Sequence, residues 1–136
     1  MSDAPIVIEC KGIKKTYHDG ARELRILRGV DLDIRPGEMI GLVGHSGSGK
    51  STLVNLICRF YDVSDGAIAV DGTDLRRFGV ADYRRHIGLV LQEPFLFSRT
   101  VRENIRYSVG GDIDDAEIEI AAKAAAVHDV IREFPG

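Results

Sequence analysis

The stretch MIGLVGHSGSGKSTLVNLI, residues 39–57, limits the possible folds of this chain more than any other segment. It opens with a continuous apolar run, Met39–Val43, of the kind found in strands buried on both faces of a sheet. After the glycines, apolar residues recur at the helical spacing i, i+3, i+4 and i+7, namely Leu53, Leu56, Ile57 and Phe60. We therefore expect a buried strand that ends at Val43, a turn, and a helix that starts within a residue or two of Lys50.

The glycine-rich turn fits the pattern G-x-x-x-x-G-K-[ST] at every fixed position. A backbone that wraps a phosphate must turn its N–H groups inward, which requires unusual angles and no Cβ in the way. The following helix directs its positive dipole end at the same anion, the lysine reaches the β- and γ-phosphates, and the serine hydroxyl suits Mg²⁺. A flexible linker would not lie between a buried strand and an amphipathic helix. The predicted nucleotide-binding residues are Gly44, His45, Ser46, Gly47, Ser48, Gly49, Lys50, Ser51 and Thr52, with no catalytic role for His45.

Charge and composition exclude several classes of protein. The 136 residues carry a net charge of −3, so no basic excess favours general binding of nucleic acid. Two cysteines without metal-ligand spacing fit a reducing compartment. No apolar window reaches membrane-spanning length, and the N-terminus lacks the features of a secretory signal, so we expect a cytosolic chain.

The remaining sequence completes an α/β pattern. Segments 6–17 and 30–34 predict strands, the latter antiparallel and half-buried, and residues 87–92 predict a second strand buried on both faces. "AIAVDG" predicts a strand that ends in an Asp-Gly hairpin turn. Residues 80–86 predict one or two helical turns. Thr100 is expected to cap a short helix, and Asp114 a longer one through "DAEIEIAAKAAAVHDVI".

The chain as a whole resembles the ATP-binding cassette (ABC) ATPases, in particular the nucleotide-binding domains of ABC exporters. The resemblance lies in "LRGVDLDIRPGEMIGLVGHSGSGKSTLVNLICRFYDVSDGAIAVDGTDL" and in "YRRHIGLVLQEPFLFSRTVRENI". It implies an α/β fold with a P-loop NTPase core and an antiparallel β-subdomain. Residues 1–99 would form the ATP-binding core with its β-subdomain, and residues 100–136 the start of a helical subdomain.

The resemblance also assigns roles to residues outside the glycine-rich turn at 44–51, which we call the phosphate loop. Tyr17 matches the aromatic residue that stacks on adenine, and Gln92 matches the glutamine that reaches Mg²⁺ or the attacking water, which adds it to Lys50 as a catalytic residue. Phe95, Leu96 and Phe97 resemble the segment beside which transmembrane domains dock, although core packing explains them equally well. The implied partners are those domains and a second nucleotide-binding domain at the cytoplasmic face of a membrane, with ATP and Mg²⁺ as cofactors.

The sequence departs from the family at two places. Ser98-Arg99-Thr100 stands where the family usually reads Ser-Gly-Thr. The Leu-Ser-Gly-Gly-Gln signature, the Walker B strand and the switch histidine do not follow, so we expect a core truncated before Walker B that binds ATP without hydrolysing it. The Walker B strand would lie between the strands at 39–43 and 87–92. The alternative is a non-catalytic nucleotide-binding or regulatory module, and a weaker one is an ABC protein that acts on DNA or ribosomes.

Overall fold

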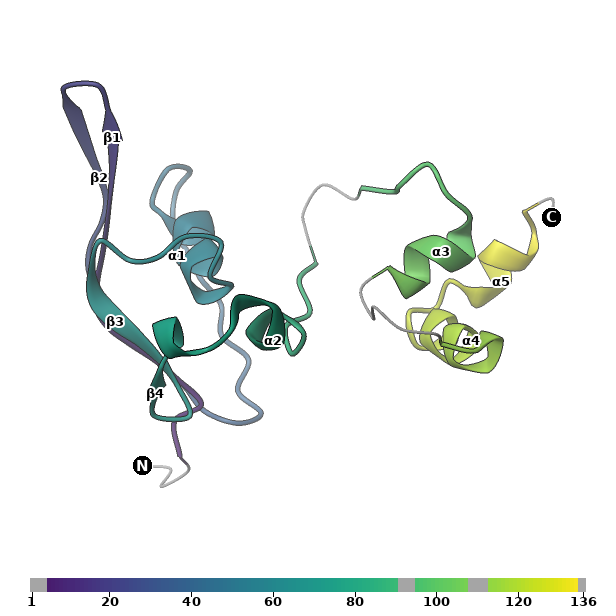
Figure 1. Cartoon of the computed structure of the whole chain (residues 1–136). Helices are drawn as coiled ribbons and strands as arrows, with labels where there is room; N and C mark the ends of the chain where they lie inside the picture. Colours follow the sequence, from purple (N-terminus) through teal and green to yellow (C-terminus); the bar gives the residue numbers. More distant parts are fainter. Residues whose placement is uncertain (1–4, 91–94, 108–112, 135–136) are drawn as a thin grey trace. The chain divides into compact units, whose positions relative to one another are not determined.

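A computed structural model describes residues 5–90, 95–107 and 113–134 of the chain. These residues gather into two compact units, residues 1–87 and residues 88–136 (Figure 1), and each unit is described by itself. The division predicted at residues 99 and 100 concerns function and stays a prediction.

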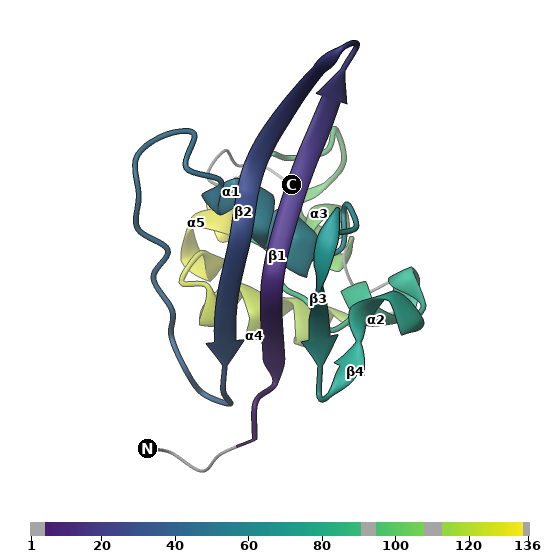
Figure 2. The same ribbon diagram turned by 90° about the vertical axis from the view of Figure 1, so that its left-hand side faces the viewer.

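The first unit contains a four-stranded antiparallel sheet in the order β2-β1-β3-β4. Figure 2 shows β2, β1 and β3 side by side, with helix α1 behind them. The strands are β1 (Ile8–Asp19), β2 (Arg22–Ile34), β3 (Asp65–Val70) and β4 (Thr73–Asp74). The alternation predicted for β2 is confirmed, because Asp31 and Asp33 are exposed while Val30, Leu32 and Ile34 are partly buried.

Two local features fix the register of this sheet. Gly12 has a φ of 57° at an irregularity in the β1–β2 pairing, and its N–H donates to Asp31 Oδ1 over 2.6 Å. The hairpin turn predicted after β3 is confirmed: Val70 pairs with Thr73, and both Asp71 and Gly72 have positive φ, as a two-residue hairpin turn requires.

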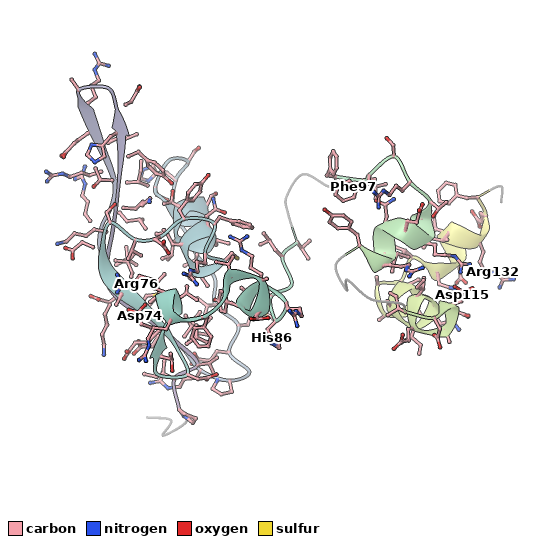
Figure 3. All side chains as sticks on the ribbon, viewed as in Figure 1. Asp74, Arg76, His86, Phe97, Asp115 and Arg132 are labelled. Carbon is pink, nitrogen blue, oxygen red and sulfur yellow. The ribbon has the colours of Figure 1, made fainter. Side chains whose placement is uncertain are left out.

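Helix α1 (Lys50–Ile57) packs its apolar side on the sheet, and its predicted start is confirmed. The core formed between them consists of Cys10, Ile13, Leu27, Leu53, Leu56, Ile68, Leu75 and Tyr83. Helix α2 (Val80–Arg84), expected as one or two turns, brings Tyr83 to this core, where its hydroxyl donates to the Ile57 carbonyl over 2.7 Å. The short 3₁₀ helix η1 (Leu75–Arg77) lies between β4 and α2. Its N-cap residue is Asp74, which pairs with Arg76 (Figure 3).

The second unit consists of α3 (Val101–Arg106), α4 (Asp115–Ala124) and α5 (His128–Arg132). Both predicted caps are confirmed: the Thr100 hydroxyl and Glu103 form a capping box, and Asp114 accepts from the Glu117 N–H. The single long helix predicted after Asp114 is wrong. The chain leaves the helical conformation at Ala126, where φ is 56°, and starts again as α5. None of the described helices has the length and apolar character that crossing a membrane requires.

The two strands predicted to be buried on both faces are not formed. Residues 39–43 have no strand conformation, and Met39 and Val43 are 100% and 98% exposed. Residues 87–90 likewise form no strand, and Val90 is 96% exposed; residues 91 and 92 lie outside the described part. A parallel strand needs a neighbour for its backbone hydrogen bonds, and no described strand pairs with either segment.

Candidate functional site

The loop before α1 curls around the ammonium group of Lys50. Lys50 Nζ donates to the carbonyl oxygens of Gly44 and His45 over 2.6 and 2.8 Å, and it lies 3.2 Å from Ser48 Oγ. The Ser48 N–H also donates back to the His45 carbonyl over 3.3 Å. These bonds close residues 44–50 into a compact loop, so the alternative of an extended linker is wrong.

The glycines of this loop differ in what a side chain would meet. A Cβ on Gly44 would lie 2.7 Å from Ser48 Oγ, so the serine side chain would have to rotate away. Gly49 has a φ of 92°, and a Cβ there would lie 2.7 Å from Leu27 Cδ2 of β2. Because Gly49 lies so close to β2, the start of α1 packs directly on the sheet.

The start of α1 leaves its N–H groups without a side-chain acceptor. Gly49 is the N-cap residue and offers no side chain, and the first turn contains no acidic residue. The orphan N–H groups and the positive end of the helix dipole therefore face the loop without a compensating negative charge. Ser51 is exposed and Thr52 is half-buried in this first turn. Such an arrangement favours an anion, and phosphate in particular.

Tyr17 lies on the same face of the sheet as α1. In the β1–β2 ladder Tyr17 pairs with Leu24, and Lys15 pairs with the buried Leu27, so alternation turns Tyr17, Lys15 and Leu27 toward α1. The Tyr17 residue is 36% exposed. Tyr17 is therefore partly accessible on the face of the sheet that carries α1.

The other predicted site residues belong to the second unit. Gln92 lies outside the described residues. Phe95 and Leu96 are 72% and 78% exposed, so the core-packing interpretation is wrong for both within this unit. The Phe97 ring, labelled in Figure 3, packs on Phe95 at 5.1 Å and on Tyr107 at 4.2 Å between centroids. Phe95, Phe97 and Tyr107 together form an exposed aromatic patch.

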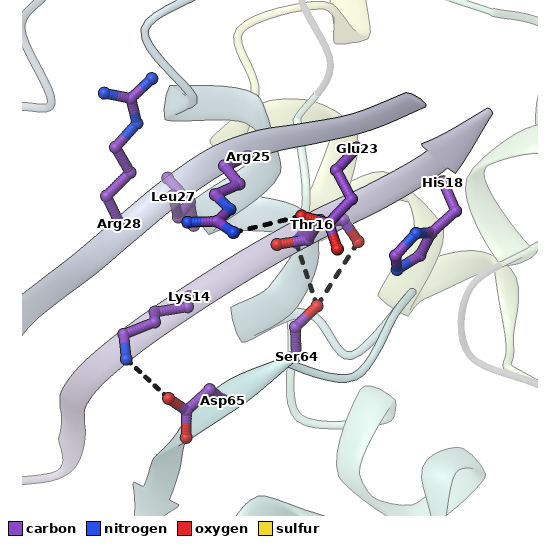
Figure 4. Close-up of a pocket in the computed structure, with 9 residues that line it drawn as sticks. All are labelled: Lys14, Thr16, His18, Glu23, Arg25, Leu27, Arg28, Ser64 and Asp65. Atoms are coloured by element: carbon purple, nitrogen blue, oxygen red, sulfur yellow. Dashed lines mark hydrogen bonds and ion pairs between the residues drawn. The ribbon is translucent and has the colours of Figure 1, made fainter. Parts of the chain in front are cut away.

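A hollow lies along the β1–β2 hairpin (Figure 4). It has a volume of about 670 Å³, and its lining includes Lys14, Thr16 and His18, which alternate with Lys15 and Tyr17. Its charges are largely paired with one another, as in Lys14–Asp65 at 2.7 Å and Arg25–Glu23 at 3.2 Å. The residues that line this hollow include none from the glycine-rich loop, although Leu27, one of them, also lies against Gly49.

Two residues near Tyr17 were missed by the sequence analysis. The Tyr61 ring meets the Tyr17 ring edge-to-face at a centroid distance of 6.2 Å, and Lys15 Nζ lies over both rings. The period-2 spacing of Lys15 and Tyr17 on one strand was a usable signal for Lys15. Tyr61 gave none, because its position depends on how the chain returns from α1.

Comparison with known proteins assigns the family. Residues 27–135 match the family described as ABC transporter. The chain is 46% identical over 128 residues to human ATP-binding cassette sub-family B member 5, covering 94% of this chain and 10% of that protein. It is 47% identical over 128 residues to the ATP-dependent lipid A-core flippase of Syntrophus aciditrophicus, covering 94% of this chain and 20% of that protein.

Solved structures agree with the sequence comparisons. A bacterial Atm1-family ABC exporter with ATP bound superposes on 99% of this chain, with a TM-score of 0.82 and 34% sequence identity, although this chain spans only 24% of that exporter's length. The matched family region includes the phosphate loop and α1, and the structural match covers nearly the whole chain. This chain belongs to the ABC transporter family, and its fold is that of the nucleotide-binding domain of ABC exporters.

Proposed function

We propose that this chain is the ATP-binding part of an exporter's nucleotide-binding domain, in which ATP binding and hydrolysis by the whole protein power transport across a membrane. Relatives named as a lipid A-core flippase and as a putative multidrug export ATP-binding/permease protein of Bacillus subtilis support this direction of transport. In this proposal the domain works at the cytoplasmic face of the membrane, and ATP·Mg²⁺ is its ligand.

The position of Lys50 is the observation that supports the proposal most. Its ammonium group lies inside the loop on two carbonyl oxygens, next to helix N–H groups that have no acidic partner. Phosphate oxygens carry formal charge, so they are better acceptors for Lys50 than the neutral carbonyls are. A bound triphosphate would therefore form favourable contacts both with Lys50 and with the N–H groups at the start of α1.

The residues present suit magnesium as well as phosphate. In the described part of the chain, no three His, Cys, Asp or Glu side chains gather into a metal site. Mg²⁺ is usually held by one or two protein oxygens together with substrate phosphates, so it needs no such cluster. Exposed Ser51, in the first turn of α1, supplies one hard oxygen, and Gln92 is the second ligand proposed.

The proposed protein partners are the transmembrane domains and a second nucleotide-binding domain. The exposed aromatic patch of Phe95, Phe97 and Tyr107 supports the first of these, because clustered exposed aromatic rings are typical of contact surfaces.

A comparison of two lysine variants tests the proposal. Lys50→Ala removes a charge-assisted bond worth about 1.5–3 kcal/mol, so the dissociation constant for ATP·Mg²⁺ should rise by roughly tenfold or more. Lys14→Ala is the matched control, because Lys14 is half-exposed on the opposite face of β1 and pairs with Asp65. Isothermal titration measures both constants, and equal values for the two variants would refute the assignment.

We further propose that the 136-residue chain binds ATP·Mg²⁺ without hydrolysing it. In the described residues, neither the Lys50 contacts nor the first turn of α1 includes a carboxylate that could polarise an attacking water. Phosphoryl transfer depends almost entirely on positioning and electrostatics, so this lack should be severe. In a phosphate-release assay with ATP, the wild-type chain should release phosphate no faster than the Lys50→Ala variant. Turnover near the roughly 1 s⁻¹ of slow ordinary enzymes, abolished in that variant, would contradict the prediction.

A further inference from the structure

We infer that Tyr61 and Lys15 are positioning residues that hold the Tyr17 ring for the nucleotide base. The inference rests on the proposed binding of ATP and adds two residues to the site. Tyr17 and Tyr61 meet edge-to-face, with an angle of 86° between ring planes and 6.2 Å between centroids. In this geometry the edge of one ring contacts the face of the other, which is a favoured aromatic arrangement.

Lys15 ties the two rings together. Its Nζ lies 5.3 Å from the centre of the Tyr17 ring and 5.6 Å from that of Tyr61, within the range of a cation–π contact. The same atom donates to the Asp62 carbonyl over 2.7 Å, and this bond anchors it beside Tyr61. Its partly buried side chain therefore joins β1 to the segment that follows α1.

The chain after α1 is fixed in the course that brings Tyr61 to β1. Helix α1 ends in a Schellman motif: the Phe60 N–H donates to the Asn55 carbonyl and the Arg59 N–H to that of Leu56, with Arg59 at a φ of 55°. A left-handed arginine is strained, and the Arg59 guanidinium offsets this strain by donating to the Phe78 and Arg76 carbonyls over 2.5 and 3.2 Å.

Hydrogen bonds then hold the returning segment alongside β1. The Ser64 N–H donates to the Lys14 carbonyl over 2.8 Å, and Ser64 Oγ accepts from the Thr16 N–H over 3.0 Å. Tyr61 thus stands between two fixed points, the end of α1 and Ser64. Tyr61 as a residue is 51% exposed, so burial in the core does not account for its position.

The arrangement connects the two ends of the proposed nucleotide site through one helix. The phosphate loop leads into the N-terminus of α1, and the loop after its C-terminus holds Tyr61 against Tyr17. With eight residues, α1 is about 12 Å long, a length comparable with the nucleotide it would serve. A change in the Tyr17–Tyr61 ring pair should therefore affect recognition of the base and leave recognition of the phosphates intact.

Binding of two probes to the full chain tests this inference. ATP·Mg²⁺ engages both ends of the site, whereas inorganic tripolyphosphate with Mg²⁺ engages only the phosphate loop. Tyr61→Ala and Lys15→Ala should each weaken ATP about three- to tenfold, the scale of one aromatic contact, and leave tripolyphosphate unchanged. Tyr61→Phe, which keeps the ring, should bind ATP like the wild type. The matched controls are Phe60→Ala, in the same loop, and Lys14→Ala, on the opposite face of β1.

The possible outcomes separate this inference from the proposed function. If the wild type binds neither probe, the proposed function fails. If ATP binds but Tyr61→Ala binds it equally well, or loses both probes together, only the positioning role is overturned. Proton NMR of the ligand-free chain gives a further check: Tyr17 ring protons should shift when the ring current of Tyr61 is removed in Tyr61→Leu. Unchanged Tyr17 resonances would overturn the inference.

Discussion

Gly49 occupies a position where backbone angle and available space both exclude a side chain. Its φ of 92° is unfavourable for any other residue, and a Cβ would lie 2.7 Å from Leu27 Cδ2. Gly47 has a similar φ of 81°, but nothing lies within 4 Å of its Cβ position. The pair therefore separates backbone strain from steric overlap within one loop.

We predict that Gly49→Ala destabilises the chain more than Gly47→Ala does. Both variants should lose about 1–2 kcal/mol through left-handed strain. Gly49→Ala should lose a further 1–3 kcal/mol or so, because the added methyl forces Leu27 to move in a packed core. Urea unfolding measures both free energies. Equal losses of unfolding free energy in the two variants would mean that α1 can move away from β2 without an energetic cost.

Asp74 provides a pH-dependent contribution to stability. Its carboxylate accepts from the Arg76 guanidinium and from the Arg76 N–H, and these bonds lower the pKa of Asp74 from 3.8 to about 2. Because the folded chain favours the charged form, this stabilisation is present above pH 4 and is lost as the pH falls toward 2.

The predicted signature is a difference between two asparagine variants. The loss of unfolding free energy caused by Asp74→Asn should be constant from pH 7 to pH 5 and should shrink between pH 4 and pH 2. The control is Asp33→Asn, since the exposed Asp33 carboxylate forms no hydrogen bond in the described part of the chain. Urea titrations at several pH values provide the comparison. A pH-independent loss would show that the Asp74–Arg76 ion pair adds nothing.

At the scale of elements, α4 ends in an unusual way. The Ala126 N–H donates to the Lys123 carbonyl and the Val127 N–H to that of Ala122, which is a Schellman motif, yet its left-handed position holds Ala126 rather than glycine. This explains the single long helix in our prediction. The usual glycine signal for a helix end is absent, and a run of alanines gives no other stop.

Ala126→Gly should raise the free energy of unfolding of the α4–α5 region by about 0.5–1 kcal/mol. The relief of left-handed strain, about 1–2 kcal/mol, exceeds the entropic cost of glycine in the unfolded chain, about 0.4–1 kcal/mol. Ala125→Gly, where φ is −82°, should instead be destabilising. Thermal unfolding followed by circular dichroism measures both changes. A lower midpoint for Ala126→Gly would contradict the strain argument.

Elements defined by local chemistry were predictable from the sequence, and those defined by distant neighbours were not. The start of α1, the caps of α3 and α4 and the turn at Asp71 each depend on residues within one turn of chain. The apolar runs at 39–43 and 87–90 have the composition of buried strands, but a strand also needs a partner, and the described sheet offers them none. Within the site, the phosphate loop was predictable because its residues are contiguous in sequence. The Tyr17–Tyr61 contact was not, because it joins residues that are far apart in the chain.

The buried apolar side chains of the whole molecule are distributed unevenly. Nine of the ten described lie between Cys10 and Tyr83, and the second unit contributes only Ala122. Local stability follows buried apolar contact, so the two units should differ in protection. Amide hydrogen exchange should be slower in β1, β3 and α1 than in α3, α4 and α5. Equal protection in the two units would contradict this expectation.

The burial of both native thiols makes the chain suitable for site-specific labelling. Cys10 and Cys58 are 1% and 5% exposed, and burial raises the pKa of Cys58 and raises that of Cys10 to about 11. Thiol reagents attack the thiolate, so both residues should react slowly at neutral pH. A cysteine introduced at exposed Ala21, in the β1–β2 turn, would then be the only fast-reacting thiol among the described residues. A fluorophore attached there lies four residues from Tyr17 and would report on the proposed base-binding end of the site without removal of a native cysteine.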